Sequence, residues 1–469
     1  MRALLPILIA ALPAVWGLAQ PVEVPEDIAG MYDRFCEALA TNNRSEAEQA
    51  MAPEALLLVV LENDGPARSV LSLPDKYVLD TLEPTFTECL VSGKCARVSY
   101  DLRLVGVETD TGEEVDLTLP RIDWLLLGDR GWGLLRSIAL DTEGQAVVAE
   151  GGIEDGEFGV SLPVPEGWEA YAVQGNSPRQ VSILGADPRT VITLSISQQP
   201  EAPAPEALLP DLPNVMPMLG GSAELLESGE VALGGLPGYH SDHRIRLQSL
   251  TLRHAEIGCF AAEDLGATLY VLSLTTTADE AFEEAKPVFD GVTANLTFTE
   301  KQPIELPAEY GTLTDGTYLN LEHQVRLDLP EGWQARILRN GREPFMLVAA
   351  KPGLRNHLAL IMVEIGQWVD PQEIARGNLQ AQQERAKRLK TIDEGVVEKG
   401  AVSGYRMVMQ GPRSTGESST IWQTYLMRST TLFVLGGYVT PQEGYESLKD
   451  EWRQVEGSLK LGPEALEAN

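Results

Sequence analysis

The stretch LPVPEGWEA at Leu162–Ala170 recurs later in the chain as LDLPEGWQA at Leu327–Ala335. Each copy continues through a Gly-Tyr pair, first at Tyr239 and then at Tyr405, to a helical segment. A repeated unit of roughly 150 residues is long enough to bury a core of its own. The repetition therefore predicts a duplicated domain.

The two copies also end in matching helical patterns. Apolar residues recur on one helical face in each copy: Phe282, Ala285, Phe289 and Val292 in the first, and Tyr445, Leu448, Trp452 and Val455 in the second. This spacing predicts an amphipathic helix, and the alternating segments upstream predict antiparallel strands. We therefore place the two domains at residues 153–299 and 313–462.

One covering element differs between the copies. Pro371 to Leu389 predicts an amphipathic helix whose exposed side is basic, through Arg376, Arg385, Lys387, Arg388 and Lys390. The same region of the first copy, from Pro200 to Pro217, is rich in proline and predicts a short or broken helix. The basic side either docks on an acidic neighbour, such as the first repeat, or is a solvated helix face.

The order of elements in each copy is a strand, the Pro-Glu-Gly-Trp turn, a hairpin, a helix, further antiparallel strands and a closing helix. This order resembles the Mog1/PsbP-like α/β/α sandwich, which includes exported bacterial members. The resemblance implies mostly antiparallel sheets and a binding or accessory role. It offers no catalytic residues to carry over.

Residues 20–142 have a different character. Ile28 to Leu39 predicts an amphipathic helix with Tyr32 and Phe35 on its apolar side, and alternating strands follow Cys95. Two helices and a meander that ends in GWGLLRSI at 131–138 resemble the cone-shaped NTF2-like fold. The expected fold class is therefore α+β, an NTF2-like domain followed by two Mog1/PsbP-like sandwiches.

The N-terminus has the pattern of a secretory signal. Arg2 precedes the apolar run Leu4 to Trp16, and small residues follow at 17–19. The run is too short for a permanent membrane anchor, so residues 1–19 are expected to be cleaved on export. We expect a periplasmic or secreted protein.

The formal net charge of −33, from 69 acidic and 36 basic residues, constrains the partners. A strongly acidic surface repels phosphate backbones, which argues against nucleic-acid binding. The expected partner is another envelope protein, with a small apolar ligand as the alternative.

The four cysteines are too few for a disulfide framework. Cys89 and Cys95 flank a Ser-Gly turn, so a hairpin could bring them within bonding range. Cys36 and Cys259 either pair with each other or stay buried as small hydrophobic residues.

No motif assigns catalytic, cofactor-binding or metal-binding residues. In the N-terminal domain, which lacks histidine, Asp33, Asp101 and Asp123 are conceivable bases, although solvated or capping roles are the simpler reading. Acidic residues between Glu108 and Asp116 crowd one hairpin without the spacing of a calcium loop. Trp168 and Trp333 are expected to plug the core of their repeats.

One cluster has metal-ligand chemistry. His240 and Asp242 would face one side of a strand and His243 the other, and His254 could join the first two if the hairpin register allowed it. Surface histidines are the simpler reading, so no metal site is assigned.

Three functions follow as hypotheses. The first is a non-enzymatic binding or assembly module that acts through its sandwich repeats. The second is a carrier of a small apolar ligand, with Tyr32, Phe35 and Trp124 lining a cavity. The third is a hydrolase or isomerase that uses the N-terminal pocket or the His240 region.

Overall fold

The architecture was established from a computed structural model of the chain. The residues that it describes are 22–52, 70–71, 73–109, 112–140, 147–149, 152–173, 179–199, 212–247, 250–263, 265–302, 310–338, 346–352, 355–365, 368–385, 389–399, 402–412, 418–441 and 444–466. Antiparallel sheets dominate, with few helices, so the class is α+β and mainly β. Among these residues, no helix is both long enough and apolar enough to cross a membrane.

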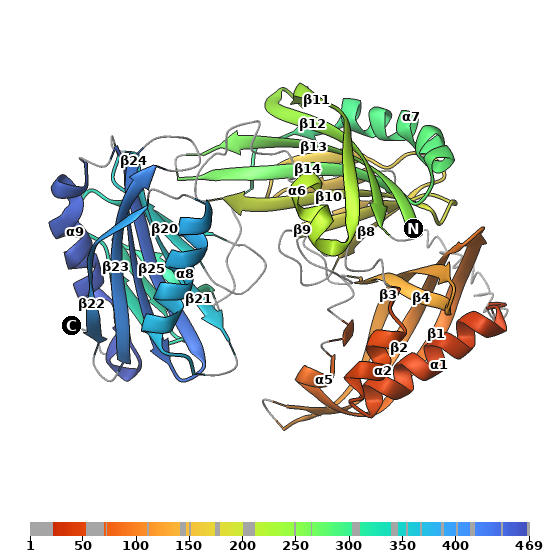
Figure 1. The fold of residues 1–469 in the computed structure, drawn as a ribbon, viewed down its shortest axis with the longest axis horizontal. Coiled ribbons are helices and arrows are strands. Elements are labelled where there is room, and N and C mark those ends of the chain that lie inside the picture. Colours follow the sequence, from red (N-terminus) through yellow and green to blue (C-terminus); the bar gives the residue numbers. More distant parts are fainter. Residues whose placement is uncertain are drawn as a thin grey trace, which may run out of the picture.

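The N-terminal domain is a four-stranded antiparallel sheet with helices against one face (Figure 1). The strands are β1 (Tyr77–Ser92), β2 (Cys95–Glu108), β3 (Glu114–Gly128) and β4 (Gly131–Ala139), and the helices are α1 (Glu26–Ala40), α2 (Arg44–Gln49) and α5 (Leu73–Lys76). Helix α1 buries Met31, Tyr32, Phe35 and Leu39 against the sheet, as its periodicity predicts. The strand β1 is the first strand of the hairpin that the Ser92-Gly93 turn predicts.

Two seven-stranded sheets follow, and their strand orders are the same (Figure 1). The first runs β11-β12-β13-β14-β10-β9-β8 and the second β22-β23-β24-β25-β21-β20-β19. The bounds of the first sheet are β8 (Glu169–Val173), β9 (Arg179–Leu184), β10 (Thr190–Gln199), β11 (Gly221–Leu233), β12 (Leu236–Leu247), β13 (Leu250–Ala262) and β14 (Ala267–Thr276). Those of the second are β19 (Gln334–Leu338), β20 (Met346–Ala350), β21 (Arg355–Glu364), β22 (Lys390–Lys399), β23 (Val402–Pro412), β24 (Ser418–Arg428) and β25 (Thr431–Thr440).

A small four-stranded sheet accompanies each large one. These are β15-β7-β6-β5 and β26-β18-β17-β16, again in matching order. The first comprises β5 (Val147–Ala149), β6 (Gly152–Asp155), β7 (Val160–Pro163) and β15 (Thr297–Phe298). The second comprises β16 (Thr312–Thr314), β17 (Thr317–Asn320), β18 (Val325–Asp328) and β26 (Lys460–Leu461), and the short 3-10 helix η4 (Pro463–Ala465) follows it.

One face of each large sheet packs against the helix that the periodicity predicts. Helix α7 (Asp279–Asn295) buries Phe282, Ala285, Phe289 and Val292, and α9 (Gly444–Ser458) buries Tyr445, Leu448, Trp452 and Val455. These residues join the strands in two separate cores. Trp333 lies in the second core, as expected, and Trp168 is half-buried against the first.

The opposite faces of the two sheets are covered differently. In the second sheet, α8 (Pro371–Arg385) buries Ala375 against Tyr405, Met407 and Met409. Of its expected basic side, Arg376 is exposed, whereas Lys387 and Arg388 lie outside the described residues. In the first sheet, the short α6 (Leu212–Val215) and η2 (Met216–Leu219) share this face with the N-terminal domain.

The first large sheet, its small sheet and α7 together are called the first sandwich, and the corresponding elements of the second copy the second sandwich. The N-terminal domain and the first sandwich share a core. Ile122, Trp124 and Leu135 of the N-terminal sheet pack with Leu184, Val191, Ile245 and Leu252 of the first large sheet. The Arg97 guanidinium reinforces this contact by donating from Nη1 to the Gly185 carbonyl oxygen at 2.6 Å. The N-terminal sheet and the first large sheet are therefore packed together as one unit.

Candidate functional site

Asp123 occupies the centre of the N-terminal domain. Its Oδ2 accepts hydrogen bonds from the hydroxyls of Tyr32 at 2.9 Å and Tyr100 at 2.8 Å, and its side chain is fully buried. Burial raises the pKa of Asp123, while Arg121 and the hydrogen bonds from Ser137 and the two tyrosines act in the opposite direction. The carboxyl group is neither solvated nor at a helix cap, so the simpler reading of Asp123 is wrong.

The other two candidate carboxylates do not join this network. Asp33 is exposed on α1, and Asp101 is half-buried on β2 between Thr85 and Pro120. Because Tyr100 and Asp101 are consecutive in a strand, their side chains leave opposite faces of the sheet. The structure therefore brings no second candidate carboxylate to Asp123.

Aromatic side chains fill the space around this network. The Tyr32 ring meets Phe86 at 5.2 Å and Tyr100 at 5.1 Å between centroids, both edge-to-face, and Phe35 is buried beside them. Trp124 lies on the other face of β3, in the core shared with the first sandwich. The expected cavity lined jointly by Tyr32, Phe35 and Trp124 is therefore absent, because consecutive strand residues point apart.

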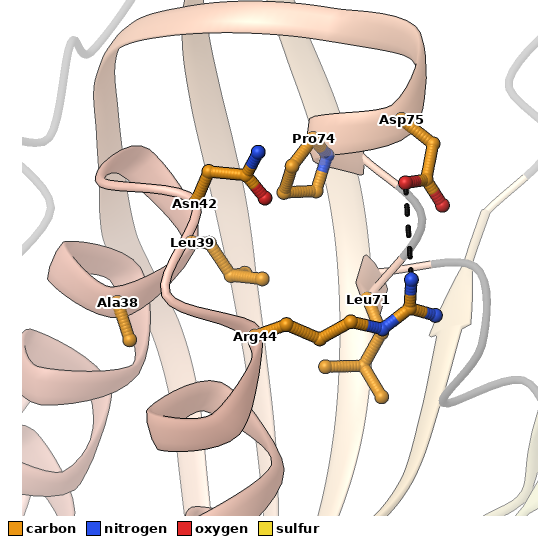
Figure 2. Close-up of a pocket in the computed structure, with 7 residues that line it drawn as sticks. All are labelled: Ala38, Leu39, Asn42, Arg44, Leu71, Pro74 and Asp75. Atoms are coloured by element: carbon orange, nitrogen blue, oxygen red, sulfur yellow. Dashed lines mark ion pairs between the residues drawn. The ribbon is translucent and has the colours of Figure 1, made fainter.

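In the N-terminal domain, a small pocket lies near the end of α1 (Figure 2). Ala38, Leu39, Asn42, Arg44, Leu71, Pro74 and Asp75 line it, and its volume is about 10 Å³. Two of these lining residues form an ion pair, in which Arg44 Nη1 lies 3.9 Å from Asp75 Oδ1 (Figure 2). This volume has room for about one water molecule, so the pocket does not admit an apolar ligand.

The histidines are not arranged as a ligand set. His243 pairs directly with His254 across β12 and β13, whereas Asp242 pairs with Ala255 and His240 with Ile257. Directly paired residues share a face, so the register does not allow His254 to share a face with His240 and Asp242. No group of three or more His, Cys, Asp or Glu side chains suited to a metal occurs among the described residues.

His243 and His254 are also buried rather than on the surface. His254 Nδ1 lies 2.9 Å from Thr275 Oγ1, and its Nε2 lies 3.2 Å from Glu256 Oε2. The pKa of His243 is lowered by burial and by His254. The pair thus belongs to the packed face of the first sheet.

The expected Cys89–Cys95 disulfide is absent, and all four cysteines are free thiols. Cys95 pairs with Ser92 at the turn, whereas Cys89 pairs with Val98. Cys89 and Ser92 are three positions apart, so the side chains of Cys89 and Cys95 lie on opposite faces. Cys95 Sγ instead lies 3.0 Å from Thr277 Oγ1 of the first sandwich.

The acidic hairpin in the N-terminal domain contains an ion pair between Arg103 and Asp116. Arg103 donates to both oxygens of Asp116, at 3.1 and 2.9 Å. Asp110 lies outside the described residues.

An open hollow of about 460 Å³ lies where the two sandwiches meet. Glu263 and Leu265 of the first sandwich and Gln334, Ala335 and Arg336 of the second line it. Glu263 forms ion pairs with Arg336 and with Lys301. Burial lowers the pKa of Arg336 to about 10.

Six of the nine large apolar side chains that are exposed among the described residues lie on edge strands, and the other three are Leu321, Trp368 and Leu466. The six are Val78 and Val91 on β1, Leu225 and Leu226 on β11, and Ile392 and Val396 on β22. Each of these strands ends the strand order of its sheet. The periodicity of the sequence does not predict which strands lie at these edges, because strand order is a property of the tertiary structure.

No family model matches the sequence, and no curated protein matches it. Solved structures similar to parts of the chain include cyanobacterial PsbP (CyanoP) from Synechocystis sp. PCC 6803, at 18% identity over 31% of this chain and 89% of that one, with a TM-score of 0.26. The Ran-binding protein Mog1p of Saccharomyces cerevisiae matches at 10% identity over 34% and 100%, with a TM-score of 0.25. The immunity protein TplEi of Pseudomonas aeruginosa matches at 13% identity over 63% and 98%, with a TM-score of 0.23. TM-scores this low decide neither the fold nor the function of this chain.

Proposed function

We propose that this chain is an exported, non-enzymatic binding or assembly protein that acts on another envelope protein through its sandwich domains. Its architecture is an NTF2-like domain followed by two duplicated Mog1/PsbP-like sandwiches. Matching strand orders in the two large sheets and in the two small sheets support the duplication. The apolar run at Leu4 to Trp16 supports export.

The observation on which the binding role rests is the edge strand β11. This strand ends the strand order of the first large sheet, and it exposes the large apolar side chains Leu225 and Leu226. An edge strand presents unpaired backbone donors and acceptors to a partner. Apolar residues there are costly to leave in water unless a second surface covers them.

The carrier of a small apolar ligand is the second candidate. A cavity between sheet and helix would favour it, but the aromatic side chains around Tyr32 and Tyr100 fill that space in the N-terminal domain. The hydrolase or isomerase is the third candidate. Asp123 is the strongest base for it, and its carboxyl group is covered on all sides.

Immobilised mature protein, residues 20–469, tests the proposal against an envelope extract. We expect a protein partner that the native chain retains and that co-elutes with it in a defined complex. Leu225→Lys and Leu226→Lys on the β11 edge should reduce retention, and Val396→Lys on the β22 edge serves as the matched surface control. Native mass spectrometry of the same preparation would favour the carrier if it found a retained small molecule and no protein.

A further inference from the structure

The edge strand β11 differs from the other exposed edges of the molecule. It has 13 residues and ends the strand order of the first large sheet, so β12 is its sole neighbour among the described strands (Figure 1). Leu225 is 42% exposed and Leu226 is 38% exposed. The strand contains neither proline nor a basic residue.

The turn after β11 fixes which backbone groups point outward. Gly234 and Gly235 both have positive φ, which forms a two-residue turn of type I′ between Leu233 and Leu236. Leu233 and Leu236 therefore form a hydrogen-bonded pair, and non-hydrogen-bonded and hydrogen-bonded pairs alternate along the hairpin from there. The backbone N–H and C=O groups of Ser228 and Glu230, opposite Ser241 and Tyr239, accordingly point away from β12.

The side chains of β11 separate by face. Glu227 pairs with Asp242, and Arg253, which binds Asp242 at 2.7 Å, lies over the Phe282 ring of α7. Glu227 therefore lies on the α7 side of the sheet. Leu225 pairs with His243 and lies on the opposite side.

The carboxylates of this edge are weakly neutralised. Glu224 lies 3.7 Å from Arg244, and Glu227 lies 3.7 Å from His240, which is charged only when protonated. The Glu227 side chain remains 76% exposed. An incoming strand with basic side chains on the α7 side would meet negative charge there, and apolar side chains on its other face would meet Leu225.

The other edges have features that block strand addition. Pro84 and two register shifts interrupt β1. Lysines stand at both ends of β22, Lys390 and Lys399. Proline, bulges and lysine are the usual means by which proteins protect exposed edges. The strand β11 has one register shift, between Leu225 and Glu227, but contains no proline and no lysine.

We propose that β11 accepts an extended segment of a partner protein by strand addition, and that this segment alternates basic and apolar residues. This inference deepens the proposed function and rests on it, because it names the surface and the chemistry of the partner. Main-chain hydrogen bonds to Ser228 and Glu230 would supply affinity, and alternate side chains would supply specificity.

A capped peptide of alternating lysine and valine is the probe, titrated against the mature full-length protein by fluorescence anisotropy. A protein of charge −33 attracts any polycation, so the matched control is the same peptide with alternate backbone nitrogens methylated. Methylation keeps the charge and removes backbone donors. We expect the methylated peptide to bind at least about tenfold more weakly.

Protein variants locate the surface. Ser228→Pro removes an outward donor at an edge position that tolerates proline, and we expect it to weaken peptide binding about tenfold. Val396→Pro on β22 is the control, because Val396 pairs with Tyr405 in the second large sheet as Glu230 pairs with Tyr239 in the first. We expect this variant to leave peptide binding unchanged. Amide hydrogen exchange on the native protein should slow at Ser228 and Glu230 when the peptide is added.

Equal affinity for the two peptides, or exchange protection elsewhere, would overturn the inference. Concentration-dependent dimerisation that Ser228→Pro abolishes would also overturn it, because the occupant would then be a second copy. A protein partner captured by the native chain and equally by Ser228→Pro would leave the proposed function standing and refute β11 as its surface. Failure to bind any partner or peptide would refute both.

Discussion

Replacing Tyr32 by Phe removes one hydroxyl group from the centre of the N-terminal domain and changes no other atom. That hydroxyl donates to Asp123 Oδ2 at 2.9 Å, and both side chains are fully buried. A hydrogen bond to a charged group contributes about 1.5–3 kcal/mol, and water cannot replace it in this packed site. We therefore expect the free energy of unfolding to fall by about 1.5–3 kcal/mol, which raises the unfolded fraction roughly 10- to 150-fold.

Urea unfolding of the mature full-length protein, followed by tryptophan fluorescence and circular dichroism, measures this loss. Tyr77→Phe is the control, because Tyr77 is half-buried at the rim of the same core, and its change should stay within about 0.5 kcal/mol. Combining Tyr32→Phe with Tyr100→Phe gives their coupling through the shared oxygen. A loss below about 0.5 kcal/mol for Tyr32→Phe would show that Asp123 is not held by this hydroxyl and would refute the reasoning.

Three further predictions concern a buried histidine, the core shared by two domains and the cysteines. The pKa of His243 is lowered by burial and by His254. Its contribution to stability is therefore complete above the unfolded pKa of about 6.5 and decreases as the pH falls below that value. A urea midpoint that does not fall from pH 7 to 5, or that remains equally pH-dependent in His243→Gln, would contradict this prediction. Trp124→Ala should cost about 3–5 kcal/mol in the core shared with the first sandwich, against a smaller loss for the more exposed Trp132→Ala, both measured by urea unfolding. Ellman titration of the denatured, unreduced mature protein should count four thiols, and a count of two would show that a disulfide forms.

The sequence by itself determined the helices and their buried faces. The spacing of Phe282 and Phe289, and of Tyr445 and Trp452, identified the sides of α7 and α9 that face their sheets. Such patterns are readable because a helix repeats every 3.6 residues whatever surrounds it. The recurrence of the Pro-Glu-Gly-Trp stretch likewise indicated two similar units, whose sheets have the same strand order.

Only the tertiary structure decided how distant residues meet. Asp123 gains its two tyrosines from α1 and β2, at sequence separations of 91 and 23 residues, and no local pattern records such pairings. Strand register separated His240 from His254 and kept Cys89 from Cys95, because a shift of one position turns a side chain to the other face. The exposed edge at β11 arises in the same way, since an edge exists only once the order of strands in the sheet is fixed.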